Sequence, residues 1–143
     1  MSVSYIPERL RRDVIGLARR RCEYCLLDER CAGKPHEIDN IIAEKHGGDT
    51  SLDNLCACCF DCNRHKGSDL CSLDGETGQV VTLFHPRLHR WDDHFERDGA
   101  VIKPISASGR VTVRLLQINR PDRVDERQLL MLYGQYPDFT AYP

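Results

Sequence analysis

This chain of 143 residues lacks the long hydrophobic runs found in membrane proteins. No apolar stretch approaches the roughly 18 residues that a helix needs to cross a bilayer. Residues 1–6 contain no basic segment followed by an apolar core, so we expect no secretory signal peptide. No internal repeat and no low-complexity tract is visible. The sequence therefore predicts a cytoplasmic protein with no membrane partner, and its length fits one domain.

The chain also lacks an excess of charge of one sign. Its 20 basic and 22 acidic residues give a net charge of −2, which argues against a protein that coats nucleic acid. Residues 1–21 nevertheless hold six arginines against Glu8 and Asp13, so six minus two gives a local charge of +4. This segment is suited to contact phosphates at one face, although a solvated helix face would carry the same charges.

Cysteine, in contrast, is abundant, with eight residues. Without an export signal, these cysteines are expected to be metal ligands or reduced thiols rather than disulfides. Two pairs have the two-residue gap that lets both thiolates bind one tetrahedral Zn²⁺. The pairs are Cys22 with Cys25, and Cys59 with Cys62. A redox dithiol would instead need a βαβ context around a single pair, and neither is visible.

The choice of ligands in the second pair has an alternative. Cys56 and Cys59 also have the two-residue gap, and Cys58 lies between them. We prefer Cys59 and Cys62, because Asn63 then directly follows the last ligand. Cys56 and Cys58 would be small buried residues on a strand, and the remaining two cysteines would be free thiols.

Sequence periodicity predicts an α+β fold. Pro7 suits the first position of a helix, and apolar residues recur at helical spacing through residues 7–20. Residues 36–42 predict a strand, a second strand begins near 52–55, and 59–66 predict a zinc knuckle that opens a short helix. Further elements are expected along the rest of the chain: strands at 79–84 and 101–105, helical turns at 91–95, a turn at 106–109, and helices at 111–118 and 121–133.

Residues 22–67 resemble the HNH endonuclease family, which has the ββα-metal fold. The resemblance rests on the two cysteine pairs, Asp39 separated by one residue from Ile41-Ile42, Gly47-Gly48, Asp53-Asn54-Leu55, and the ending Asn63 to Gly67. It implies a small zinc-stabilised ββα-metal core with an N-terminal helix in residues 1–70. Residues 71–143 would form a mixed C-terminal extension packed on this core, within one structural domain.

The resemblance also implies roles for four residues. Asp39 and Asn63 would bind a catalytic Mg²⁺ or Mn²⁺, and their oxygen atoms are the hard ligands that Mg²⁺ prefers. Asn54 would brace the loop at the site. The family has a general-base histidine at the position of Asn40, but an amide has no basicity near neutral pH. A lost general base costs about 10²–10⁴ in rate, unless another histidine such as His36 or His46 replaces it.

The sequence therefore predicts a metal-dependent DNA endonuclease that is catalytically impaired at Asn40, with double-stranded DNA favoured over single strands or RNA. The alternatives are a non-catalytic zinc-containing nucleic-acid-binding module and a zinc domain that binds proteins. Basic side chains beside the cysteine pairs and the glycine loop are the expected nucleic-acid contacts. These residues are Arg19, Arg20, Arg21, His46, Arg64, His65 and Lys66.

Overall fold

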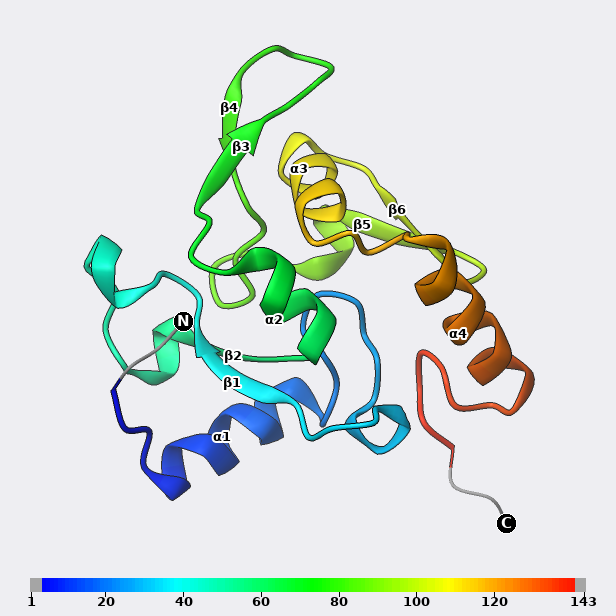
Figure 1. Cartoon of the computed structure of the whole chain (residues 1–143), viewed down its shortest axis with the longest axis horizontal. Helices are drawn as coiled ribbons and strands as arrows, with labels where there is room; N and C mark the ends of the chain where they lie inside the picture. The colour runs from blue at the N-terminus through cyan, green and yellow to red at the C-terminus, as the bar shows by residue number, and fades with distance from the viewer. Residues whose placement is uncertain (1–3, 141–143) are drawn as a thin grey trace.

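The structure of the chain is a computed structural model that describes residues 4–140. It has the predicted α+β fold, in which short antiparallel strand pairs alternate with helices (Figure 1). In chain order the helices and strands are α1 (Glu8–Ala18), β1 (Glu37–Asn40), β2 (Leu55–Cys58), α2 (Phe60–Lys66), β3 (Cys71–Leu73), β4 (Val80–Thr82), β5 (Phe95–Asp98), β6 (Val101–Pro104), α3 (Ala107–Leu115) and α4 (Pro121–Leu132).

The ββα unit predicted for the middle of the sequence is confirmed. β1 pairs antiparallel with β2, so that Asp39 lies opposite Cys56 and Asn40 lies opposite Leu55. α2 begins one residue after β2, and Cys59 is its N-cap. Because successive side chains of a strand point to opposite faces, Asp39 and Asn40 leave β1 on different sides.

The predicted N-terminal helix is confirmed and packs against β2. Val14 and Ala18 on its inner face are buried with Ile6, Ile38 and Leu55 in a small apolar core. The helix ends where Arg19 and Arg20 take positive φ angles of 55° and 62°. The chain then turns directly into the first cysteine pair.

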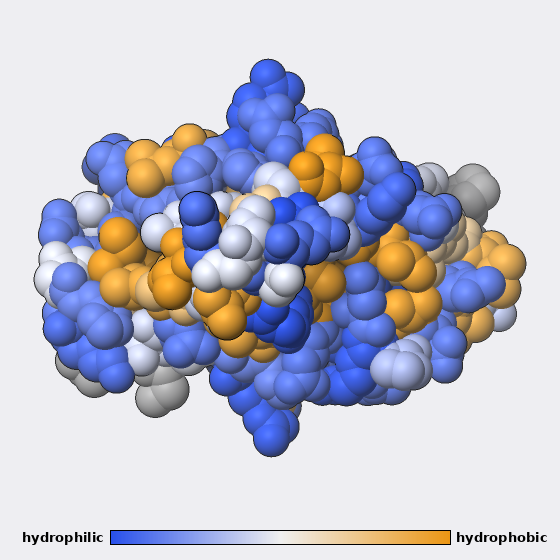
Figure 2. All heavy atoms as spheres, turned by 90° about the horizontal axis from the view of Figure 1, so that it is seen from above, coloured by the Kyte–Doolittle hydropathy of each residue, from blue (hydrophilic) through white to orange (hydrophobic). Residues whose placement is uncertain are grey.

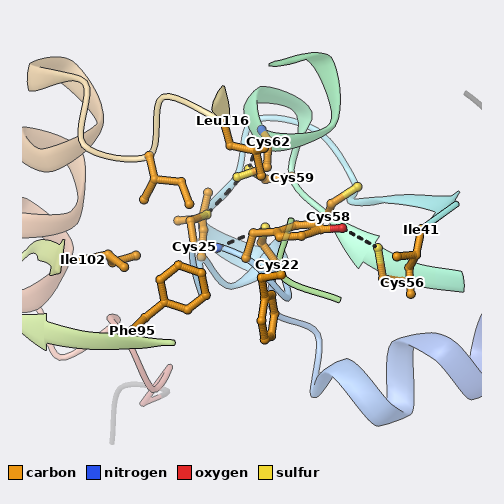
Figure 3. Close-up of a cluster of buried hydrophobic side chains, with 14 residues drawn as sticks. Cys22, Cys25, Ile41, Cys56, Cys58, Cys59, Cys62, Phe95, Ile102 and Leu116 are labelled. Carbon is orange, nitrogen blue, oxygen red and sulfur yellow. Dashed lines mark hydrogen bonds between the residues drawn. The ribbon is translucent and has the colours of Figure 1, made fainter. Parts of the chain in front are cut away.

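A larger core joins the ββα unit to the C-terminal elements. The four cysteines of the two pairs are buried with Tyr24, Phe84, Phe95, Ile102 and Leu116. Figure 3 shows Phe95, Ile102 and Leu116, which belong to the C-terminal half of the chain, near the cysteines. Apolar side chains from both parts of the chain are thus buried in one cluster. The boundary near residue 70 between the core and the C-terminal extension stays a prediction.

The expected turn at 106–109 is wrong, because these residues begin α3. The Ser106 hydroxyl accepts a hydrogen bond from the Gly109 amide at 2.9 Å and caps the helix. Gly109 is required by packing rather than by a turn, since a Cβ there would lie 2.2 Å from the carbonyl oxygen of His94. Strands β3 and β5 were not predicted, because they span only Cys71–Leu73 and Phe95–Asp98, which is too short for an alternating pattern to stand out.

The surface seen in Figure 2 is mostly hydrophilic, with separate hydrophobic patches. Several apolar side chains of α4 are exposed, among them Leu129 and Leu132. None of the helices within residues 4–140 is long and apolar enough to cross a membrane.

Candidate metal centre and active site

Four cysteine sulfur atoms meet in the core between the end of α1 and the start of α2. The Sγ atoms of Cys22, Cys25, Cys59 and Cys62 all lie within 4.8 Å of one another, and all four side chains are buried (Figure 3). The Cys25 and Cys59 sulfurs are 3.7 Å apart. Tetrahedral Zn²⁺ with Zn–S bonds of about 2.3 Å places its sulfurs about 3.8 Å apart. The cluster predicted from the sequence therefore fits a structural zinc site.

In both cysteine pairs, a backbone amide is placed where it stabilises a negatively charged sulfur. The Cys25 amide lies 3.5 Å from the Cys22 sulfur, and the Cys62 amide lies 3.4 Å from the Cys59 sulfur. Each amide donates to the first sulfur of its own pair, so both pairs have the same local arrangement. Leu26 has a φ of 68° and turns the chain back after the first pair.

The burial of these four cysteine sulfurs favours binding of a cation between them. Removal from water raises the pKa of Cys22 and of Cys62 well above the ordinary thiol value. The pKa of Cys25 is lowered, chiefly by the hydrogen bonds that its sulfur forms with the sulfurs of Cys22 and Cys59. A divalent cation at the centre would offset the burial penalty and keep all four sulfurs ionised.

A second site lies beside β1. Asp39 of β1 and Asn63 of α2 line one surface hollow of about 530 Å³. Asp39 is 6% exposed and Asn63 is half-buried. Cys62 directly precedes Asn63, so the cysteine cluster sets the position of this amide. A carboxylate and an amide oxygen at one hollow are a donor set that fits a hard divalent cation.

Asn54 holds the chain between β1 and β2. Its Oδ1 accepts from the Ile42 amide at 2.9 Å, and its Nδ2 donates to the carbonyls of Ile42 at 2.9 Å and Asp49 at 2.8 Å. The loop packs tightly here, because a Cβ at Gly48 would lie 1.8 Å from the Ile42 oxygen. These contacts are what a brace for this loop requires.

Asn40 is attached to the same loop. Its Nδ2 donates to the Asp49 carbonyl at 2.9 Å, and its side chain is only 2% exposed. The carbonyl decides which end of the amide faces it, since only the NH₂ group can donate. The other end, Oδ1, is buried and has no hydrogen-bond partner among the described residues. Such an unsatisfied acceptor costs about 1–3 kcal/mol.

Comparison with protein families agrees with this geometry, because the model of the HNH endonuclease family matches residues 22–69. We refer to these residues, which match the family model, as the HNH domain. A search of curated proteins and a search of solved structures each found no match. The HNH domain makes up about a third of the chain and contains both cysteine pairs, Asp39, Asn40, Asn54 and Asn63. α1 and all elements after residue 69 lie outside it.

The basic residues of the HNH domain that were expected to contact nucleic acid have different surroundings. Arg64 is exposed and lines the hollow with Asp39. His46 is exposed, and its Nε2 lies 3.1 Å from the Ser68 carbonyl. His65 is half-buried, with its Nε2 at 3.1 Å from the Arg120 guanidinium. Lys66 is 5% exposed, and its ammonium donates to the Ile41 carbonyl at 2.8 Å. Its side chain therefore points toward the protein interior.

Three more arginines that were expected to contact nucleic acid directly follow α1. Arg19 and Arg20 are exposed, whereas Arg21 is half-buried and forms an ion pair of 3.0 Å with Asp138. None of the three lines the hollow that holds Asp39. His36, considered as a substitute base, has its Nε2 at 2.8 Å from the Leu27 carbonyl. That contact directs it toward the loop after the first cysteine pair.

Arg123 of α4 is a residue that sequence reasoning missed. Its guanidinium is 3.1 Å from the Cys62 sulfur and 3.7 Å from the Cys59 sulfur, and it also donates to the carbonyls of Leu116 and Gln117. Arg123 is 6% exposed. Four thiolates around Zn²⁺ carry a net charge of −2, so a buried guanidinium partly neutralises the centre. No motif marks Arg123, because 61 positions separate it from Cys62.

Proposed function

We propose that this chain is a metal-dependent endonuclease that hydrolyses phosphodiester bonds in DNA, weakened because Asn40 occupies the position of the general base. The observation that carries the proposal is that Asp39 and Asn63, both residues of the HNH domain, line the same hollow. We favour double-stranded DNA over single strands or RNA. No disulfide joins any of the eight cysteines, all of which lie within the described residues, and this agrees with the reducing, cytoplasmic setting that we propose.

Asp39 and Asn63 would hold a Mg²⁺ or Mn²⁺ ion, and zinc would remain in the cysteine cluster. When bound, a divalent ion of this kind stabilises the charge that develops on the phosphate. The chain's own contribution is to place the ligands. The sulfur cluster fixes the start of α2 and therefore Asn63, while the pairing of β1 with β2 fixes Asp39.

The hydrogen-bonding pattern at Asn40, with one satisfied donor and one buried unpaired acceptor, would suit an imidazole better than an amide. In histidine, Nδ1 is bonded to Cγ as Nδ2 is in asparagine, so an imidazole in the same orientation could donate to the Asp49 carbonyl. The ring Cδ2–H would then occupy the place of the buried Oδ1 and would need no partner. Nε2 would be left to accept a proton, which an amide cannot do.

The test compares the native chain with Asn40→His, using plasmid DNA in Mg²⁺ or Mn²⁺. We expect Asn40→His to nick DNA about 10²–10⁴ times faster than the native chain. The matched control is Asn40→His combined with Asp39→Ala, which should not cut. Zinc content and the unfolding midpoint are measured for each variant, so that lost activity is not confused with lost folding. If well-folded Asn40→His cleaves DNA in neither Mg²⁺ nor Mn²⁺, the proposal is overturned.

A second function is a non-catalytic zinc module that binds nucleic acid. The observation that favours it is Asn40 itself, which is buried and lacks a basic atom. This function predicts salt-dependent DNA binding by the native chain with no cleavage by Asn40→His. A zinc domain that only binds proteins should show no such DNA binding.

A further inference from the structure

Two arginines from different elements line the hollow that contains Asp39 and Asn63. Arg11 belongs to α1, outside the HNH domain, and Arg64 belongs to α2. Both side chains are exposed. Neither guanidinium forms a hydrogen bond or ion pair with any residue of the part described, 4–140.

The charges around the hollow favour an anion once its acidic residues hold a cation. Its described lining includes the basic Arg11 and Arg64 and the acidic Glu37 and Asp39, so two minus two gives zero. A divalent ion on Asp39 and Asn63 would raise this sum to +2. Guanidinium groups bind phosphate oxygens through two parallel hydrogen bonds, and a concave surface strengthens their field.

We propose that Arg11, together with Arg64, binds backbone phosphates of DNA next to the Asp39–Asn63 site. This inference rests on the proposed function and makes α1 part of the DNA-binding surface. It assigns the role of the basic N-terminal segment to Arg11 rather than to the arginines at the end of α1, which do not line the hollow. The α1 helix packs against β2, so Arg11 is held beside the site by the buried face of its own helix.

The same helix offers a matched control. Arg12 is also exposed and lies next to Arg11 in the sequence, but it does not line the hollow. Adjacent residues of a helix point about 100° apart, so the two side chains leave α1 in different directions. Removing either arginine changes the net charge of the protein by the same amount, and only position differs.

The experiment measures binding of the zinc-loaded chain to a short fluorescent DNA duplex in Mg²⁺ at salt concentrations from about 50 to 200 mM. We expect Arg11→Gln to reduce the slope of log affinity against log salt by about 0.9, the value of one phosphate contact. A fourfold rise in salt should then weaken binding about 3.5-fold less than in the native chain. Arg11→Lys should keep the native slope because it keeps the charge, and Arg12→Gln should leave the slope unchanged.

Equal slopes for Arg11→Gln and Arg12→Gln would overturn the inference, as would an Arg11→Gln slope equal to the native one. So would a native chain that shows no salt-dependent binding. The proposed function is judged separately by cleavage with Asn40→His. If that variant cuts DNA while Arg11→Gln behaves like Arg12→Gln, the nuclease assignment stands and the role of Arg11 is wrong.

Discussion

Replacing Arg123 with methionine should weaken zinc binding as well as folding. Methionine fills similar space but cannot donate to the sulfurs of Cys59 and Cys62 or to the two carbonyls that Arg123 now satisfies. Removing one partner of a buried charge interaction costs about 3–5 kcal/mol of unfolding free energy. Loss of an outer-shell partner typically lowers metal affinity by about 10–100-fold, or about 1.4–2.7 kcal/mol.

Arg127 provides the control, because it is the same residue type one turn further along α4. It is 2% exposed and donates to the carbonyls of Ala100 and Ile118 and to Asn119, but it makes no hydrogen bond to a sulfur. Arg127→Met should therefore lower the free energy of unfolding by a similar amount and leave zinc affinity close to native. Arg123→Lys, which keeps the charge with fewer donors, should lie between Arg123→Met and the native chain.

The assay is competition for zinc with a coloured chelator, run beside urea unfolding of the zinc-loaded proteins. The expected result is a 10–100-fold loss of zinc affinity in Arg123→Met alone. Native zinc affinity in Arg123→Met would refute the reasoning. So would an equal loss in Arg127→Met, because a general loosening of α4 would then explain both.

Two further predictions concern folding. Gly48→Ala should lower the free energy of unfolding by about 2–3 kcal/mol, because its Cβ would lie 1.8 Å from the Ile42 oxygen. The measurement is urea unfolding, and an unfolding midpoint equal to that of the native chain would contradict the tight packing of this loop. Hydrogen bonds from Arg110 hold the pKa of Asp74 below its ordinary value. This ion pair therefore stabilises the folded protein fully above the unfolded pKa of about 3.9, and the stabilisation is lost as the pH falls below that value. Asp74→Asn should therefore destabilise the protein at pH 7, and this difference should shrink in acid; a difference that does not change with pH would contradict the ion pair.

Short-range patterns carried most of what could be predicted of the ββα unit. The two-residue gap within each cysteine pair suits one metal whatever surrounds it, because both sulfurs reach the same point from one turn of chain. The order of strand, loop, strand and helix likewise depends on neighbouring residues. The prediction failed at Gly109, where a glycine inside a helix was taken as part of a turn. A glycine is needed there because the carbonyl of His94, which is distant in the sequence, leaves no room for a Cβ.

The four cysteines for zinc were predicted from their spacing, and the cluster fits that prediction. The resemblance to the HNH family predicted Asp39 and Asn63 for a hard metal and an asparagine in place of a base, and these roles stay proposals. Only tertiary structure decided which charges serve that chemistry. It turns Lys66 inward to the Ile41 carbonyl, places Arg123 against the sulfurs, and brings Arg11 to the hollow that Asp39 lines. The physical reason is that a ligand motif is local, whereas burial and the position of a charge depend on which distant segments pack together.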